Sequence, residues 1–526
     1  PYFCVRDITN TTEGILSKKY QDEYARINND FIYKKNKSLK VKKKSNCNSL
    51  YEIKSNEDID AMICEMMDDK SIDYTVKEIH NYTMMLPKEY WGPGSYDKWI
   101  RVGWALKNHS ERLVLTWYKF CSQSEDFDFV CNDVLEHWSN FGIYNKEGLT
   151  YKSIMYWCRM SDYDEYNKIY KNTVEYYIQY SFQKNNDTEV DLANTLFHMY
   201  KSQYVCVSIK EDTWYEFQNN KWYPIDCGTT LRSKISREMY NLYSKKVIEF
   251  QTKNNVIQNN MITPSSQENT IVSNQSDESF SDYKKKMESM FTTCKLLKKT
   301  ATKNNIMREC KELFYDKEFL NKLDKNEYLL GCSNCIIDFK NKEHRKGKHD
   351  DYVSKSTNLN YFPLSQYQKN NQKDIDEIYE FMRQLFPNKD LLGYMWEHLA
   401  STLLGTNENQ TFNIYTGSGA NGKSKLVELM SIILGEYKGT VPITLVTQKR
   451  NNIGGTSSEV YNLIGKRYAV MQEPSKGDKI NEGIMKELTG GDPIQCRALF
   501  QNSMTFIPQF KLVVCTNTLF DIISND

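Results

Sequence analysis

The sequence predicts a multidomain protein of mixed α+β and α/β structure, in which helical domains precede an α/β domain with a phosphate-binding loop. The chain has 526 residues, enough for about three to five domains of ordinary size. Residues 84–165 combine many tryptophans with a helical spacing of apolar residues, which predicts a helical domain. Residues 391–526 carry a glycine-rich loop between a strand-like run and a helix-like run, which is typical of nucleotide-binding domains.

Charge balance and hydropathy exclude two classes of protein. Lys and Arg number 69 and Asp and Glu number 68, so the whole chain is not a basic nucleic-acid coat, and any nucleic-acid surface must be local. Mean hydropathy is −0.68, and no apolar run approaches the ~18 residues that a membrane-spanning helix needs. The 14 cysteines are scattered singly apart from Cys332 and Cys335, which favours free thiols in a reducing compartment.

The first part of the chain changes character near residue 84. Residues 1–83 are polar and rich in lysine, and we expect a solvated arm or the end of a preceding domain. In the helical domain 84–165, large aromatic residues at helical spacing are expected in the core rather than as base-stacking platforms. The tryptophans concerned are Trp91, Trp99, Trp104, Trp117, Trp138 and Trp157.

Residues 170–248 are predicted to form an α/β domain with a β-hairpin. Two alternating runs flank Asn219 and Asn220, a pair that suits a tight turn, and a helix is expected from about Thr230. Residues 249–283 are rich in Asn, Ser, Gln and Thr and predict a flexible insert. Helical periodicity then returns over 284–390.

The strongest chemical signal is the stretch from Gly417 to Ser424, which matches the phosphate-binding pattern G-x-x-x-x-G-K-S/T. Glycines let backbone N–H groups turn toward phosphate oxygens, the lysine reaches the β- and γ-phosphates, and the last hydroxyl binds Mg²⁺. A short apolar strand precedes the loop and an amphipathic helix follows it, which aims the helix N-terminus at the anion. The predicted binding residues for ATP and Mg²⁺ are Gly417, Ser418, Gly419, Ala420, Asn421, Gly422, Lys423 and Ser424.

Two polar residues that follow apolar strands complete the predicted catalytic set with Lys423. Glu473 would orient or deprotonate the attacking water, or bind Mg²⁺ with Ser424, directly or through water. Gln472 stands where many P-loop ATPases carry Asp, which leaves one carboxylate rather than two. Asn517 ends a buried-strand pattern, and its amide could hydrogen-bond the γ-phosphate or the catalytic water.

The order of these elements resembles a superfamily 3 helicase, the compact AAA+-type ATPase of DNA viruses. By motif, the loop takes the Walker A role, Glu473 the Walker B role, 486–497 the B′ motif and Asn517 the sensor of motif C. Upstream, several segments resemble the primase C-terminal domain of the second type and the accessory region of poxvirus-type primase-helicases of nucleocytoplasmic large DNA viruses. These segments are 96–108, 138–141, 149–157, the hairpin domain, 304–310, 334–338, 345–347 and 351–354.

The resemblance covers about residues 90–526 and implies an ATP-dependent 3′–5′ DNA helicase for viral DNA replication, coupled to a primase. It would make residues 1–83 the end of a primase-like domain. It also implies a closed ring, expected to be a hexamer, on single-stranded and forked DNA, with other replication proteins as partners and no membrane. The expected location is intracellular, in host cytoplasm or a viral replication factory. Candidate DNA contacts are Lys486, Arg497, Gln501 and Lys511.

The sequence departs from the family pattern after motif C. It stops at Asp526, so we expect a truncated ATPase core that lacks one family strand and leaves the strand at 411–415 as an exposed edge. It also lacks the arginine that completes a neighbouring subunit's ATP site. We therefore expect weak ATP binding and almost no hydrolysis by this chain alone, since such an arginine contributes about 10³–10⁵ in rate.

Two alternative functions stay open at this point. The first is a primase or nucleotidyl transferase in which the P-loop domain is auxiliary; strand-borne paired carboxylates with a histidine would favour it. The second is a non-catalytic assembly module that uses ATP only to oligomerise. The missing arginine favours the second alternative for this chain alone. Glu473 argues against it for the whole product, because a module that only binds ATP needs no residue to activate water.

Overall fold

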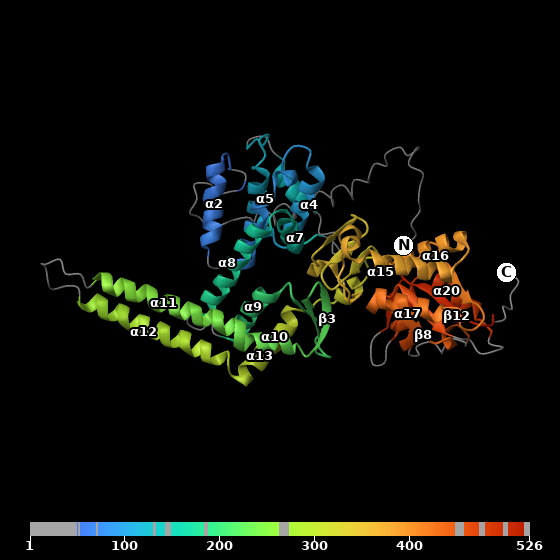
Figure 1. The fold of residues 1–526 in the computed structure, drawn as a ribbon. Helices are drawn as coiled ribbons and strands as arrows, with labels where there is room; N and C mark the ends of the chain where they lie inside the picture. The colour runs from blue at the N-terminus through green and yellow to red at the C-terminus, as the bar shows by residue number, and fades with distance from the viewer. Residues whose placement is uncertain are drawn as a thin grey trace, which may run out of the picture. The chain divides into compact units, whose positions relative to one another are not determined.

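The computed structural model, shown in Figure 1, describes residues 50, 53–69, 72–129, 133–141, 149–183, 188–261, 273–447, 457–472, 479–497 and 503–519. The chain divides into two compact units, residues 1–176 and 177–526. The mixture of helical regions with α/β regions agrees with the predicted fold class. Within the described ranges, no helix has both the length and the apolar composition needed to cross a bilayer.

The first unit is helical. Its elements are α2 (Asn56–Asp68), α3 (Tyr74–Met84), η3 (Lys88–Tyr90), α4 (Tyr96–Lys107), η4 (Glu111–Leu113), α5 (Val114–Cys121), α6 (Val134–Asn140), α7 (Tyr151–Ser161) and α8 (Tyr163–Ser181), which begins in this unit. The side chains of Ser55 and Asp73 cap α2 and α3 by accepting hydrogen bonds from N–H groups of the first turn. Both helices begin before residue 84, and Ile59, Met62 and Ile79 are buried in the same core as the residues of α4 and α5. The expectation of a solvated arm is therefore wrong for α2 and α3, because the apolar faces of these helices pack in this core.

The tryptophans of this unit form most of its core, as predicted, with one exception. Trp117 and Trp138 are buried, and Trp91, Trp99 and Trp157 are partly buried against the same cluster. Trp104 is 36% exposed and lies outside that cluster, so the core prediction is wrong for it. The reason is its position on α4, where Val102, Ala105 and Leu106 face the core and Trp104 points away from them.

The second unit begins with a helix and an antiparallel sheet. Its elements are α9 (Glu189–Tyr200), β1 (Tyr204–Ser208), β2 (Thr213–Gln218) and β3 (Lys221–Asp226). The predicted hairpin is confirmed: Gln218 pairs with Lys221, and Asn219 and Asn220 between them have φ angles of 49° and 69°. Two successive positive φ angles are what a two-residue hairpin turn requires, and asparagine tolerates them better than most residues.

Long helices are found over 249–261 and 273–283, where a flexible insert is predicted, and residues 262–272 of that insert lie outside the described residues. The elements in order are α10 (Thr229–Lys234), η5 (Ile235–Met239), α11 (Tyr240–Met261), α12 (Ser273–Leu296), α13 (Thr300–Leu313) and α14 (Phe319–Lys322). Helices α11 and α12 lie side by side (Figure 1), and the rings of Phe250 and Tyr283 stack with centroids 5.3 Å apart. The prediction is wrong over 249–261 and 273–283, because polar residues suit a solvated helical pair as well as a loop.

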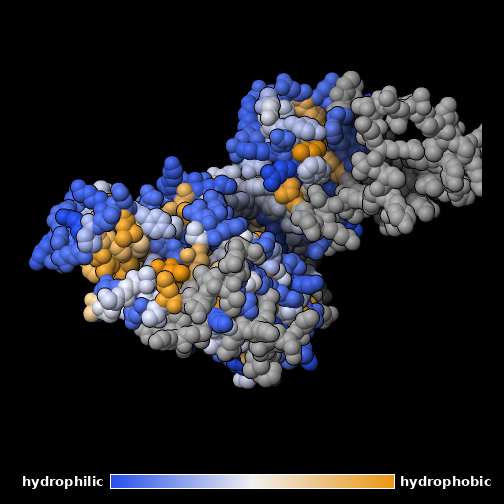
Figure 2. Space-filling view, turned by 90° about the vertical axis from the view of Figure 1, so that its right-hand side faces the viewer, coloured by the Kyte–Doolittle hydropathy of each residue, from blue (hydrophilic) through white to orange (hydrophobic). Residues whose placement is uncertain are grey.

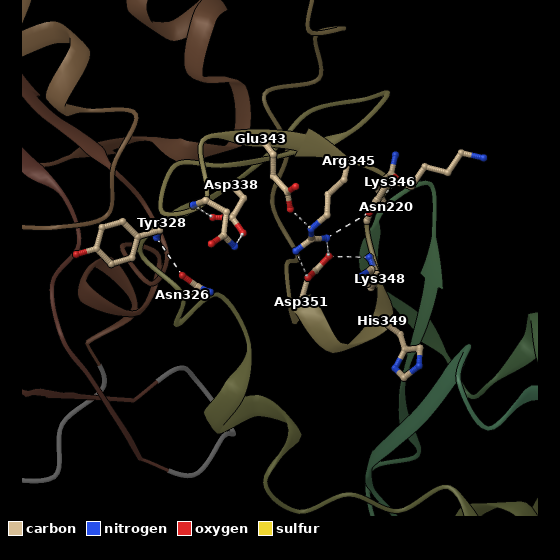
Figure 3. A network of polar contacts seen from close by, with 12 residues as sticks. Asn220, Asn326, Tyr328, Asp338, Glu343, Arg345, Lys346, Lys348, His349 and Asp351 are labelled. Atoms are coloured by element: carbon tan, nitrogen blue, oxygen red, sulfur yellow. Dashed lines mark hydrogen bonds and ion pairs between the residues drawn. The ribbon is translucent and has the colours of Figure 1, made fainter. Parts of the chain in front are cut away.

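A second antiparallel sheet and two helices lead to the glycine-rich loop. They are β4 (Leu329–Gly331), β5 (Ile336–Asp338), β6 (Glu343–Arg345), η6 (His349–Asp351), α15 (Leu364–Leu385) and α16 (Lys389–Ser401). The polar network around β6 is shown in Figure 3. Arg345 donates two hydrogen bonds to the carboxylate of Asp351, at 2.8 and 2.9 Å, and Gly347 N donates to Asn220 Oδ1 at 2.8 Å. These contacts fasten the segment 345–351 to the β2–β3 turn.

The last part of the second unit is built on a parallel sheet with strand order β7-β12-β9-β8. Its elements are β7 (Phe412–Thr416), α17 (Lys423–Leu434), η7 (Gly435–Tyr437), β8 (Lys438–Val441), α18 (Thr444–Thr447), α19 (Ser458–Tyr461), β9 (Tyr468–Gln472), α20 (Glu482–Thr489), β10 (Ile494–Cys496), β11 (Met504–Phe506) and β12 (Lys511–Thr516). Alternate residues of β12 belong to different core clusters: Leu512 and Val514 pack in one cluster, and Val513 packs in the other. The sheet is thus covered on both faces, as parallel sheets usually are.

Candidate nucleotide-binding site

The glycine-rich loop follows β7 at the carboxyl edge of the parallel sheet. It spans residues 417–422, all of them exposed or half-buried, and α17 begins directly after it. Gly422 has a φ of 80°, and a Cβ there would lie 2.4 Å from Cδ1 of Leu385 at the end of α15. This position therefore needs glycine for its backbone angle and for the close approach of α15. Ala420 also has a positive φ, 63°.

Lys423 lies at the start of α17, and its ammonium is held by three oxygen atoms. Nζ donates to the carbonyl of Gly417 at 2.9 Å, to Oδ1 of Asn421 at 3.0 Å and to Oδ1 of Asn517 at 2.9 Å. The acceptors are neutral amide and carbonyl groups, so these three contacts leave the positive charge of the ammonium uncompensated. A cation in this state at an exposed loop is suited to bind an anion.

The contact between Lys423 and Asn517 joins residues 94 positions apart in the sequence. Its cause is the sheet: β7 and β12 are parallel neighbours with Thr416 opposite Thr516. Residues that follow each strand therefore emerge at the same edge. The structure thus brings together the lysine and the asparagine that the sequence predicts for one site. Ser424 lies in the first turn of α17 and is exposed.

Neutral side chains that are buried or half-buried lie next to the loop. The OH of Tyr415, near the end of β7, is hydrogen-bonded to Nε2 of His398 at 2.8 Å. Burial lowers the pKa of His398, which favours the neutral imidazole. Burial also raises the pKa of the Cys515 thiol on β12, and the nearby Lys423 opposes that rise. Lys423 therefore supplies positive charge beside the neutral side chains of Tyr415 and Cys515.

Sequence reasoning missed Leu385 and His398 as neighbours of the loop. Leu385 is on α15 and limits the space at Gly422, while His398 is on α16 and orients Tyr415. Both precede the loop in the chain, on helices whose patterns show only that one face is apolar. No local signal in the sequence identifies them, because their positions depend on how these helices pack beside β7.

Two of the predicted site residues, Glu473 and Gln501, lie outside the described residues. Lys486 is exposed on α20, and Arg497 is exposed directly after β10. Strands β10 and β11 pair antiparallel in this region, with Gln495 opposite Thr505. Lys486 and Arg497 therefore remain accessible to a ligand.

Lys511 is not accessible, and its prediction as a DNA contact is wrong. Its side chain is buried, and Nζ donates to the carbonyls of Leu404, at 3.1 Å, and of Thr406. Burial, with a smaller contribution from the charge of Arg467, lowers the pKa of Lys511 to about 8. The sequence shows a lysine at the start of an apolar strand, but only the packing of the preceding segment 402–406 shows that this lysine binds carbonyls.

Arg467, one residue before β9, is a second buried cation at this end of the sheet. Its guanidinium donates to the carbonyls of Leu403 and Leu329, and it lies over the ring of Tyr437 with its Cζ 4.9 Å from the centroid. Burial lowers the pKa of Arg467. Leu329 belongs to β4 and Leu403 follows α16, whereas Arg467 itself leads into β9. Its side chain therefore links the β4–β5–β6 sheet to the parallel sheet.

The far end of the loop helix α17 is fastened to the upstream part of the same unit. Oε2 of Glu436, in the turn after α17, accepts hydrogen bonds from Nζ of Lys221 at 2.6 Å and from Ser356 N at 2.7 Å. The hydroxyl of Tyr437 accepts from Gly331 N at 2.8 Å and donates to the carbonyl of Lys355 at 3.0 Å. Helix α17 thus connects the glycine-rich loop at one end with the two antiparallel sheets at the other.

We expect Glu436→Ala to lower the free energy of unfolding by about 2–3 kcal/mol, because Lys221 would lose its carboxylate partner in a buried setting. The Lys221 side chain is 8% exposed and that of Glu436 is 40% exposed, so the loss should lie below that of a fully buried pair. Chemical denaturation measures the effect. Glu428→Ala is the matched control, because its pair with Lys425 is exposed and should change stability by less than about 0.5 kcal/mol. Equal losses in the two variants would contradict the prediction.

Comparison with known families gives matches in three successive regions. Residues 79–158 match the family described as primase C terminal 2, and residues 193–387 match the family described as D5 N terminal like. Residues 415–526, which contain the glycine-rich loop, match a family of unknown function.

Similar whole proteins come from large DNA viruses. "Putative helicase L207/L206" of Acanthamoeba polyphaga mimivirus is 31% identical over 434 residues, which is 82% of this chain and 42% of that protein. "Putative helicase 121R" of Invertebrate iridescent virus 3 is 26% identical over 451 residues, 81% of this chain and 46% of that protein.

"Putative primase C962R" of African swine fever virus (isolate Pig/Kenya/KEN-50/1950) is 22% identical over 469 residues, 86% of this chain and 47% of that protein. The chain spans about half the length of the curated relatives it matches. The family resemblance drawn from the sequence is confirmed at this level. With its primase C-terminal and D5 N-terminal-like regions in this order, the chain belongs with the primase-helicases of large DNA viruses.

Proposed function

We propose that this chain is the ATP-dependent motor portion of a superfamily 3 DNA helicase that acts in viral DNA replication together with a primase. The observation that supports this most strongly is the contact between Lys423 and Asn517 at the carboxyl edge of the parallel sheet. Nζ of Lys423 and Oδ1 of Asn517 lie 2.9 Å apart beside the glycine-rich loop, which supports a shared role of the two side chains at a γ-phosphate. Helicase names among the relatives support the same function.

In this proposal ATP binds over the glycine-rich loop. Lys423 would exchange its three amide and carbonyl partners for oxygens of the β- and γ-phosphates, and N–H groups at the start of α17 would face the phosphates. Ser424 and Glu473 would hold Mg²⁺, which neutralises charge on the phosphates. Glu473 would also orient or deprotonate the attacking water, and Asn517 would hydrogen-bond the water or the γ-phosphate.

The proposed assembly is a closed ring, expected to be a hexamer, that surrounds single-stranded DNA at a fork. Exposed apolar side chains on α15 and α16 support packing between subunits; they include Leu364, Ile378, Tyr379, Leu391 and Tyr394. Figure 2 shows one face of the molecule, where hydrophobic patches stand among mostly hydrophilic residues. Lys486, Arg497 and Gln501 stay the proposed DNA contacts. The proposed location is host cytoplasm or a viral replication factory.

The direct test is ATP turnover by the full-length gene product with and without single-stranded DNA, followed by unwinding of a forked duplex, because this chain alone is expected to hydrolyse almost no ATP. DNA-stimulated turnover with strand separation is the expected result. Primer synthesis from nucleoside triphosphates without unwinding would instead favour the primase alternative, which the name of the swine fever relative supports. ATP-dependent oligomerisation without turnover would favour a non-catalytic assembly module.

Glu473→Gln separates the motor from the assembly module. The amide keeps the size of the side chain but cannot accept a proton from water, so we expect turnover to fall by at least about 10²-fold. ATP binding should be retained, since the loop and Lys423 are intact. Filter binding of labelled ATP and steady-state turnover measure the two quantities. Unchanged turnover would remove Glu473 from the proposed mechanism.

A further inference from the structure

Two helices of the first unit present aromatic side chains that the core does not use. Trp104 on α4 is 36% exposed and Tyr156 on α7 is 41% exposed. Neither belongs to the core cluster of this unit or packs against it as a partly buried member, although neighbouring aromatic residues do. Helices α4 and α7 pack against each other. The exposed rings therefore need an explanation other than core packing.

The same two helices also carry cationic side chains, which lie close to aromatic rings. The guanidinium of Arg101 on α4 lies over the Trp157 ring of α7, with its Cζ 5.7 Å from the centroid. The guanidinium of Arg159 lies over the Tyr156 ring at 5.9 Å. Arg101 precedes Trp104 by three residues, so the two side chains share one face of α4.

Acidic residues are absent from this part of both helices. The sequence has none from Lys98 to Lys107 on α4 and none from Tyr151 to Ser161 on α7. Lys152 is exposed and lies one turn before Tyr156 on α7. Asp97 lies beyond one end of the surface and Asp162 beyond the other. The surface is thus locally basic on a chain whose net charge is only +1.

We propose that this surface, formed by Arg101, Trp104, Lys152, Tyr156 and Arg159, binds single-stranded DNA. Bases stack on the rings of Trp104 and Tyr156, and the guanidinium and ammonium groups contact phosphates. Duplex DNA fits less well, because its bases are already stacked on each other. An apolar peptide also fits less well, because cations flank the rings.

This site belongs to the first unit, whereas the glycine-rich loop and the β10–β11 hairpin belong to the second, so the site goes beyond the proposed motor. The proposal of this site rests on the proposed function in one respect only, namely that the ligand is single-stranded DNA. The two proposals can therefore fail separately. Loss of the α4–α7 site should leave DNA-independent ATP turnover unchanged, whereas loss of Lys423 should leave DNA binding at α4–α7 unchanged.

The test uses the whole chain and a fluorescein-labelled oligothymidylate of about 15 nucleotides, a length within the site sizes of single-strand binding folds. Fluorescence anisotropy gives the affinity. We expect the double variant Trp104→Ala with Tyr156→Ala to bind at least about tenfold more weakly, since one stacked base contributes about 5- to 150-fold. Arg101→Gln should weaken binding and reduce its dependence on salt.

Matched variants control for non-specific effects. Arg112→Gln removes an exposed arginine elsewhere in the same unit and should leave affinity unchanged. Trp104→Phe keeps an aromatic ring and should restore most of the binding, which a purely structural role of the indole would not predict. Ultraviolet crosslinking of the wild-type complex should attach thymine to peptides that contain Trp104 or Tyr156, which separates this site from DNA bound by the second unit.

Several results would overturn the proposal. One is equal affinity of the double variant and the wild type together with no crosslink in these peptides. Another is equal binding of a duplex of the same length, which would make the contact electrostatic without stacking. A change in oligomeric state in the double variant, with DNA binding unaltered, would make the surface a protein interface.

Discussion

ATP turnover of the full-length gene product should fall by at least about 10²–10³-fold in Lys423→Ala, the change for which we expect the largest effect on function. Removal of one preorganised donor to a developing charge has a cost of this order, about 2.7–4 kcal/mol in the activation free energy. Lys423 is the cation within hydrogen-bond distance of both the glycine-rich loop and Asn517. Its loss would also weaken ATP binding, because the phosphates would lose a charge-assisted hydrogen bond.

Steady-state phosphate release and equilibrium binding of labelled ATP measure the two effects. Lys425→Ala is the matched control, because Lys425 is in the same turn of α17 but is exposed and paired with Glu428. It should leave turnover within about twofold of the wild type, consistent with the small contribution of an exposed pair. Turnover that survives in Lys423→Ala would remove the loop from the proposed mechanism.

A double-mutant cycle tests whether Lys423 and Asn517 act in one site. Each single alanine variant should reduce turnover, and the double variant should be little worse than Lys423→Ala alone, because both residues bind the same phosphate in the proposal. Additive losses in activation free energy would mean that the 2.9 Å contact has no consequence for catalysis.

Arg467→Ala should produce the largest loss of stability, about 3–5 kcal/mol in the free energy of unfolding of the second unit. The variant removes a buried side chain, leaves a cavity, and deprives the carbonyls of Leu403 and Leu329 of their donors. Arg467→Lys should lose less, because it retains a cation but lacks the planar fork that reaches two carbonyls at once.

Hydrogen exchange of peptides that cover β9 and β12 measures this effect within the multidomain chain. We expect exchange to become about 10²–10³-fold faster where it requires opening of the sheet. Arg497→Ala is the control, since Arg497 is exposed and its removal should change stability by less than about 0.5 kcal/mol. Unchanged protection of β9 in Arg467→Ala would show that the two carbonyls find other donors.

The elements that sequence reasoning predicted best are those whose signals are local. The β2–β3 hairpin follows from two asparagines between alternating runs, and β7, the loop and α17 follow from an apolar run, glycines and an amphipathic helix. The prediction of a loop is wrong over 249–261 and 273–283, because polar composition does not distinguish a loop from a helical pair.

The sequence by itself determined which residues follow the strands of the parallel sheet and which chemistry they offer. Lys423 and Asn517 are examples: Asn517 comes directly after β12, and Lys423 belongs to the glycine-rich pattern that follows β7. The sequence also indicated a resemblance to primase-helicases of large DNA viruses, which the matches over 79–158 and 193–387 support.

Only the tertiary structure decided which of these residues meet and which charges are buried. The strand order brings Asn517 next to Lys423. The packing of segment 402–406, which follows α16, buries Lys511 against backbone carbonyls. The orientation of α4 about its own axis leaves Trp104 outside the core. Local patterns reflect contacts between residues a few positions apart. Burial and strand order depend on free energies summed over distant segments, which no single window of the sequence contains.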